Sequence, residues 1–147
     1  MTKPIPVVGE PVPPIVDGGM LHIAKASIGI ATTNDVVMTG EIAATPIFTV
    51  AAGTIVYDLL AKVVTAFTAS AALTIGDSDD VDGYMAVTEL VSTVISSELR
   101  TSKGSTALTA VYQFGKIYAA EQTIDVTAGA TFAVGQADVY LVYSRVG

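Results

Sequence analysis

Charged side chains concentrate at one place in this sequence, an acidic loop that reads Asp77-Ser78-Asp79-Asp80-Val81-Asp82-Gly83. Calcium takes hard oxygen ligands, and an acidic loop with a glycine turn can supply them. Counted from Ser78, oxygen side chains fall at positions 1, 3 and 5, with glycine at 6 and Glu89 at 12, which is EF-hand spacing. The candidate calcium ligands are therefore Ser78, Asp80, Asp82 and Glu89.

The surroundings of this loop favour a plainer interpretation. Ser78 replaces the aspartate usual at the first position, which removes one charged ligand. The preceding residues 73–75 read as a strand, whereas an EF-hand has helices on both sides. Asp and Gly also satisfy turn geometry without any metal. We expect a solvated turn and no cofactor, with a calcium loop as the alternative.

Catalytic chemistry has little support in the sequence. A catalytic base needs an orienting group and a nucleophile, but His22, the only histidine, lies within the apolar strand pattern Leu21-His22-Ile23, which favours a strand or interface histidine. No nucleophile elbow or phosphate-binding glycine loop occurs. Cysteine is absent, which excludes disulfides, zinc-thiolate sites and thiol nucleophiles. We expect that the protein is not an enzyme.

Four tyrosines lie late in the chain, at positions 112, 118, 140 and 143. Aromatic rings on a sheet face can stack on sugars or bases. Only Lys116 and Arg145 lie near them, so stacking on nucleic acid is not expected. Packing in the core or at a subunit interface is the default interpretation, and a sugar-binding face that uses Tyr140 or Tyr143 is the alternative.

The composition describes a folded, acidic chain. It has 147 residues, which suits one domain, and is 51% hydrophobic and 14% charged, with a net charge of −7. Disordered chains show low hydrophobicity and high net charge. The acidity argues against direct nucleic-acid binding and against a polybasic membrane-surface protein. No membrane span or signal peptide is evident, so we expect synthesis in the cytoplasm of the producing cell.

Five of the six prolines lie in the first 14 residues. Because proline fixes φ and favours extended neighbours, residues 1–19 are expected to form an extended arm before a body at 20–147. Apolar residues alternate with the prolines, so the arm should lie either along its own domain or on a neighbouring protein. The candidate contact residues are Pro4, Ile5, Val7, Val8, Pro11, Val12, Pro13, Pro14 and Ile15.

The body reads mainly as β-structure, since short runs rich in Val, Thr, Ile and Tyr alternate with glycine-containing breaks. This pattern predicts an antiparallel sandwich or barrel. A long strand is favoured over a helix at 54–68, and 85–99 could form one short helix. In the last strand, Val139, Leu141 and Tyr143 should face one side, with Tyr140 and Val142 on the other. The remaining predicted strands are 20–26, 35–42, 46–51, 72–75, 107–114, 122–127 and 137–145.

The order of several short motifs resembles small structural proteins of tailed bacteriophages. The motifs are Thr54-Ile55-Val56-Tyr57-Asp58, then Val64 to Phe67, Leu73-Thr74-Ile75-Gly76-Asp77, the acidic turn, and the closing Val139-Tyr140-Leu141-Val142-Tyr143. The resemblance covers about residues 53–145 and transfers no individual functional residue. It implies a virion component with a sandwich or jelly-roll body, often trimeric. The proline-rich arm is similar to those by which capsid-decorating proteins hold neighbouring subunits.

Two hypotheses of function follow. The first is a capsid decoration (cement) protein on the outer surface of a phage head, with the major capsid protein as partner and a homotrimer as the expected assembly. The second is a tail, neck or fibre module of the adhesin type that binds sugar.

Overall fold

The computed structural model describes residues 7–8, 20–67, 73–85, 99–101, 112, 115–129 and 131–146, with only the backbone at 7–8 and 99–101. These residues form strands and turns, and the described part contains no helix. The strands are β1 (Val7–Val8), β2 (His22–Gly29), β3 (Val36–Val37), β4 (Ile42–Val50), β5 (Thr54–Thr65), β6 (Leu73–Gly76), β7 (Leu99–Thr101), β8 (Lys116–Tyr118), β9 (Gln122–Ala128) and β10 (Gln136–Arg145). No described helix is long and apolar enough to cross a membrane.

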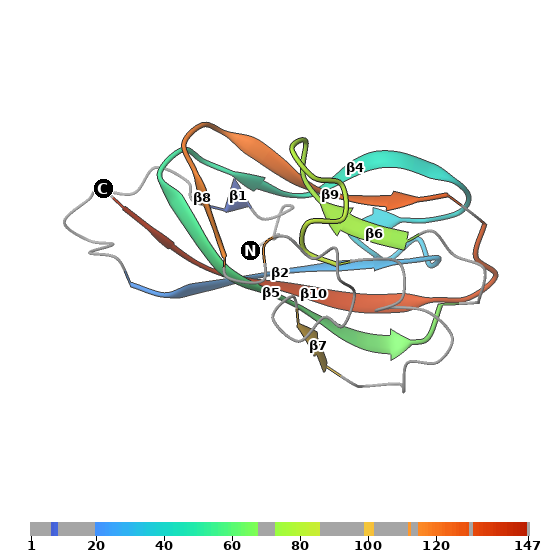
Figure 1. The fold of residues 1–147 in the computed structure, drawn as a ribbon. Helices are drawn as coiled ribbons and strands as arrows, with labels where there is room; N and C mark the ends of the chain where they lie inside the picture. Colours follow the sequence, from blue (N-terminus) through green and yellow to red (C-terminus); the bar gives the residue numbers. More distant parts are fainter. Residues whose placement is uncertain are drawn as a thin grey trace.

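The strands form two sheets that face one another across the core (Figure 1). One sheet has the order β1-β4-β9-β6. The other has the order β3-β2-β10-β5-β7, with β8 also paired to β5. The predicted β-sandwich is therefore confirmed.

The pairing is that of one long hairpin rolled into two layers. From the outer ends inward, β2 pairs with β10, β4 with β9 and β5 with β8, all antiparallel. An antiparallel bridge between Ile75 and Met85 closes the innermost pair. Rolling then brings β10 beside β5 and β9 beside β6. Nested pairs of this kind define a jelly roll.

Alternation along β10 was predicted correctly, because one face of this strand is buried. Ala137, Val139 and Leu141 are buried, while Tyr140 and Val142 are partly exposed on the other face. Tyr143 packs against the core, on the same side as Leu141.

The long strand predicted at 54–68 is present as β5, but its faces differ from the simple alternation. The register with β10 passes from Asp58 to Val56 and leaves Tyr57 as an extra residue in a bulge. On one side of the bulge Val56 is buried, and beyond it Leu59 is buried. Tyr57 consequently lies on the outer face, whereas strict alternation along the long strand predicted from the sequence would have put it on the same face as Leu59.

Other predicted strands are confirmed in part. The segment 35–42 contains only the short β3 before β4 begins, whereas 46–51 falls inside β4. Pro46 sits at an irregular position in the β4–β9 register, where a missing N–H is tolerated. The predicted strand 107–114 and helix 85–99 lie almost wholly outside the described residues. Leu99 begins β7, and β8 was not predicted.

The core lies between the layers and is built from both. Phe67 and Phe132 meet edge to face with ring centroids 5.3 Å apart. The largest fully buried side chains are Tyr84, Tyr118, Phe48, Phe67, Ile28, Met38, Ile47, Leu59, Leu73, Ile75 and Met85.

Candidate functional site

The acidic loop is organised by its first residue. Asp77 follows β6 directly and is only 2% exposed. Its Oδ1 atom accepts hydrogen bonds from the backbone N–H groups of Asp79 and Asp80, at 3.0 and 3.2 Å. An aspartate that bonds to the backbone two and three residues ahead fixes a tight turn. Asp77 therefore sets the conformation of the loop.

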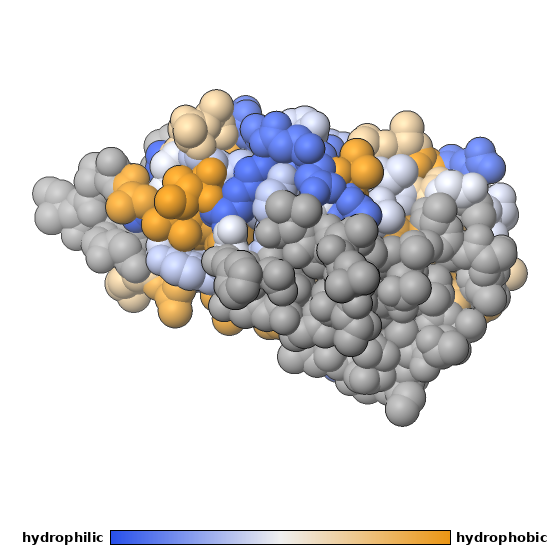
Figure 2. Space-filling model, viewed as in Figure 1, coloured by the Kyte–Doolittle hydropathy of each residue, from blue (hydrophilic) through white to orange (hydrophobic). Residues whose placement is uncertain are grey.

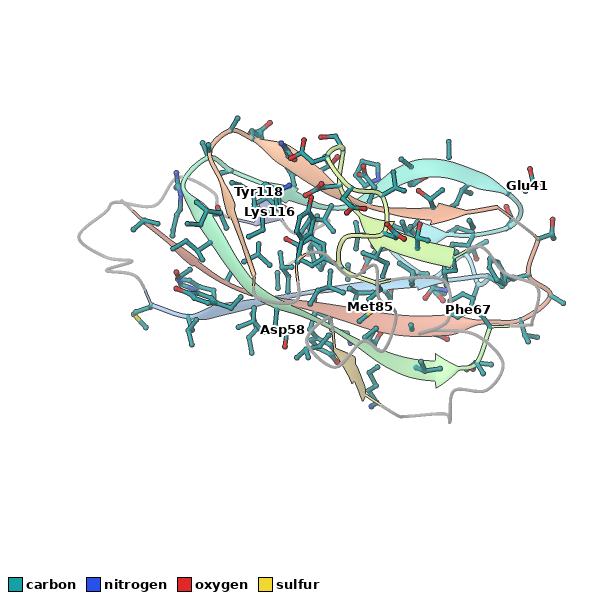
Figure 3. The ribbon with its side chains drawn as sticks, viewed as in Figure 1. Glu41, Asp58, Phe67, Met85, Lys116 and Tyr118 are labelled. Atoms are coloured by element: carbon teal, nitrogen blue, oxygen red, sulfur yellow. The ribbon has the colours of Figure 1, made fainter. Side chains whose placement is uncertain are left out.

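A lysine from another strand neutralises this buried carboxylate. Lys116, at the start of β8, places Nζ 2.6 Å from Asp77 Oδ2 and 2.8 Å from Asp79 Oδ2. The Lys116 side chain is 15% exposed and that of Asp77 is fully buried. Figure 3 shows Lys116 and Tyr118 extending from β8 toward the region under the loop. The ion pair thus ties the loop to the opposite sheet.

Three tyrosines complete what we call the Asp77 cluster, which consists of Asp77, Lys116, Tyr84, Tyr112 and Tyr118. The Tyr112 and Tyr118 hydroxyls donate to the two Asp77 oxygens at 3.0 and 2.7 Å. The Tyr84 and Tyr118 hydroxyls are 2.9 Å apart. Lys116 Nζ also donates to the Tyr112 hydroxyl and lies 4.4 Å from that ring's centroid. Each buried polar group of the cluster therefore has a partner.

The cluster holds its charges fixed at neutral pH. Burial raises the pKa of Asp77, but hydrogen bonds from Lys116 and the tyrosines outweigh it and lower that pKa below 3.8. Burial lowers the pKa of Lys116, but its bonds to the two aspartates raise that pKa overall. Burial raises the pKa of Tyr84 and of Tyr118. All four shifts move away from neutrality, whereas a general acid or base needs a pKa near the working pH.

A glycine makes room for the cluster. A Cβ atom on Gly83 would stand 2.3 Å from a ring carbon of Tyr112, closer than any stable contact. The Gly83 carbonyl accepts the backbone N–H of Tyr112 at 2.9 Å, and the two rings of Tyr84 and Tyr112 meet edge to face. The end of the acidic loop therefore packs directly on Tyr112.

The predicted calcium ligands do not gather around one point in the described part of the chain. Ser78 Oγ donates to Gln122 at 3.4 Å. Asp80 accepts the backbone N–H of Asp82, and a hydrogen bond between their carboxyl groups raises the pKa of Asp80. Glu89 lies outside the described residues. Among the described residues, no group of three or more acidic, histidine or cysteine side chains could hold a metal ion.

The other candidates lie elsewhere. His22 stacks on Tyr143 with ring centroids 5.3 Å apart, which fits its interpretation as a strand histidine. Tyr140 lies on the outer face of β10, with Lys25 Nζ 5.8 Å from its ring centroid. Tyr140 and Tyr143 are thus on opposite faces and cannot form one flat platform for a sugar.

One part of the arm is placed against its own domain. Val7 and Val8 pair in parallel with Thr49 and Val50 of β4, at the edge of the four-stranded sheet. The remaining arm candidates, from Pro4 to Ile15, lie outside the described residues.

The sequence did not reveal the Asp77 cluster. The three side chains that bond to the Asp77 carboxylate, those of Tyr112, Lys116 and Tyr118, lie 35 to 41 residues further along the chain, and no local spacing connects them to it. The EF-hand count began at Ser78 and so passed over Asp77. The sequence signal that could have indicated the cluster was Asp77 at the end of a strand, with Lys116 later in the chain between Tyr112 and Tyr118.

Comparison with known proteins identifies the fold. No protein-family model and no curated protein matches the sequence. Among solved structures, a chain of the cyanophage Pam1 capsid asymmetric unit is similar, with a TM-score of 0.58 and 15% identity, over 86% of each chain. A chain of the acid-stable capsid of Helicobacter pylori bacteriophage KHP30 gives a TM-score of 0.59 and 12% identity, over 86% of this chain and 89% of that one.

A chain of the Ralstonia phage GP4 capsid gives a TM-score of 0.55 and 14% identity, over 92% of this chain and 89% of that one. Because coverage is high in both directions, the three capsid chains have nearly the length of this one. At such low identity the likeness establishes the shared fold, a complete jelly roll of this size, and no more.

Proposed function

We propose that this protein is a structural subunit of a tailed-phage virion, and specifically a capsid decoration protein that binds the outer surface of the head and stabilises it. The observation that carries the proposal is the whole-chain likeness to chains from three phage capsids. The sequence resemblance points to the same class of protein. In this role the partner is the major capsid protein, and the virion surface is the location.

The interactions inside the protein support a structural role without catalysis. Among the described charged residues, Asp77 is the one that is buried as a whole, and the cluster around it fixes a loop and offers no group poised for proton transfer. Small apolar residues dominate the chain, which suits close sheet packing and broad interfaces. We expect no catalytic activity.

The arm is proposed as the capsid contact. Its apolar residues beyond β1, namely Pro11, Val12, Pro13, Pro14 and Ile15, gain most if a neighbouring protein buries them.

The test uses capsids of the phage that encodes this chain, prepared without it. One variant replaces residues 11–15 with glycine and serine and leaves β1 in place; a control variant carries Glu41→Gln on the exposed start of the β4 region. We expect the full chain and the control to co-sediment with capsids, and the arm variant to melt normally but bind at least about tenfold more weakly. Unchanged binding by the arm variant would overturn the arm's role, and no binding by the full chain would overturn the proposed function.

A further inference from the structure

The outer face of the six-stranded sheet carries an apolar patch at the end where β2 begins. We define the outer apolar patch as Leu21, Ile23, Ile55, Tyr57, Ile117 and Val142. Leu21, Ile23 and Ile117 are 65%, 69% and 67% exposed. Figure 2 shows orange, hydrophobic residues along the lower left margin, at this end of the sheet.

Strand register makes these residues neighbours. Ile117 pairs with Ile55, and Ile55 pairs with Ser144 on the next strand. Two residues back along β10, Val142 pairs with Ile23. Tyr57 faces outward between these rows because of the β5 bulge, and its hydroxyl lies 3.0 Å from Ser144 Oγ. Four strands thus contribute to one continuous surface.

The patch adjoins a strand edge that the described residues leave unpaired. β2 pairs with β10 along its length, but on its other side β3 reaches only Ile28 and Gly29. Residues 23–26 therefore present backbone groups with no described strand beside them. An exposed edge recruits a further strand unless charge or proline blocks it. Here Lys25 lies on the edge and Asp35 Oδ2 accepts the backbone N–H of Ser27 beside it, so the unpaired stretch is short and partly protected.

The charges on the outer face of the six-stranded sheet indicate what kind of protein can bind there. Along the outer face of β2, β10 and β5 the charges of Lys25, Lys62, Asp58 and Asp138 balance, and Lys25 and Asp138 form an ion pair at 3.2 Å. Asp35, whose Oδ2 accepts the backbone N–H of Ser27 at 2.7 Å, adds one negative charge beside β2, so the face is close to neutral. The net charge of −7 is carried elsewhere, in part by the acidic loop on the other layer (Figure 1). An acidic protein can approach this face with little repulsion, and a basic partner gains little here.

We propose that the outer apolar patch is the contact with a second copy of this chain. An identical copy brings the same apolar surface and the same face of low net charge, which suits a chain whose net charge is −7. Contiguous exposed apolar surface is rare on soluble monomers and marks interaction sites. A standard interface buries about 800 Å² per partner, so the patch forms its centre, and the β2 edge together with Met20 and Val146 forms its rim.

The test is the mass of the full chain in solution, by light scattering across a concentration series. The monomer mass is 15.0 kDa, and we expect a whole multiple of it for the unchanged chain. Ile23→Asp and Ile117→Asp should raise the dissociation constant by about tenfold or more while the thermal melt of the diluted protein stays unchanged. The matched control is Val134→Asp, which places the same charge on a 49% exposed residue outside the patch.

The proposal is overturned if the unchanged chain is monomeric at all concentrations. It is also overturned if the two patch variants keep the assembled mass, or if Val134→Asp disrupts assembly to the same extent. Because no capsid is present, this experiment is independent of the decoration proposal. If the protein assembles but does not bind capsids, the proposed role of the outer apolar patch stands and the decoration proposal is refuted. If a strictly monomeric protein binds capsids, the decoration proposal stands and the role of the patch is refuted.

Discussion

Lys116 Nζ and Asp77 Oδ2 are 2.6 Å apart, although 39 residues separate them in the sequence. Lys116 comes from β8 of one sheet, and Asp77 directly follows β6 of the other. A salt bridge between solvent-exposed residues contributes little to stability. The Lys116–Asp77 pair is buried, so the loss of either residue leaves the charge of the other without its counter-charge.

Removal of the cation should destabilise the fold strongly. Lys116→Met leaves the Asp77 carboxylate buried without a counter-charge, and we expect the free energy of unfolding to fall by about 3 kcal/mol. Urea denaturation measures this. The control is Lys25→Met, because the Lys25–Asp138 pair is at the surface, with Lys25 47% exposed, and should contribute less than about 1 kcal/mol. Equal losses for the two variants would contradict the role of the cluster.

The double variant Asp77→Asn/Lys116→Met tests whether the two residues act as a unit. Without the carboxylate, the lysine has less to neutralise, so the combined loss should be smaller than the sum of the single losses by about 1 kcal/mol or more. Additive losses would show that the pair is not coupled.

Gly83→Ala should disturb Tyr112. The added Cβ would lie 2.3 Å from the ring, so the ring must shift away from its bond to Asp77, at a cost of about 1–3 kcal/mol. The control is Gly40→Ala, because a Cβ there meets nothing within 4 Å. Thermal melting should separate the two variants clearly, and a neutral Gly83→Ala would refute the packing of the loop on Tyr112.

Acid should weaken the contribution of Asp77 only at low pH. Its folded-state pKa lies below the ordinary 3.8, so the stabilisation is complete above that value and is lost as the pH falls through the folded pKa. The difference in unfolding free energy between the unchanged chain and Asp77→Asn should stay constant down to about pH 5 and shrink between about pH 5 and pH 2. The pKa of Asp80 is raised, so its contribution to stability changes with pH in the direction opposite to that of Asp77. Both proteins should therefore carry Asp80→Asn. A difference that already declines near pH 6 would contradict the lowered pKa of Asp77.

Calcium should leave the melting temperature unchanged. Lys116 already supplies positive charge to Asp77 and Asp79, and Asp80 bonds to Asp82. A melt with calcium and a melt with chelator should superimpose. If calcium raises the melting temperature, and Asp82→Asn abolishes that rise, the result would instead support a calcium site with EF-hand-like spacing in the loop.

The sequence predicted the features that depend on local patterns. Alternation along β10 and the length of β5 follow from residue type and burial on one face. The direction of Tyr57 could not be predicted, because the bulge exists only in the pairing of β5 with β10. β8 has only three residues, too few for a pattern, and the Asp77 cluster depends on β8. Contacts made by the rolling of the long hairpin were therefore beyond sequence reasoning.

We propose that this chain is a structural part of a phage capsid. Electron cryomicroscopy of particles from the encoding phage, produced with and without this protein, tests it most directly. We expect jelly-roll density on the outer surface of the head in the first sample and none in the second, and we expect the particles of the second sample to be less resistant to heat. Heads with identical density and heat resistance in both samples would contradict it.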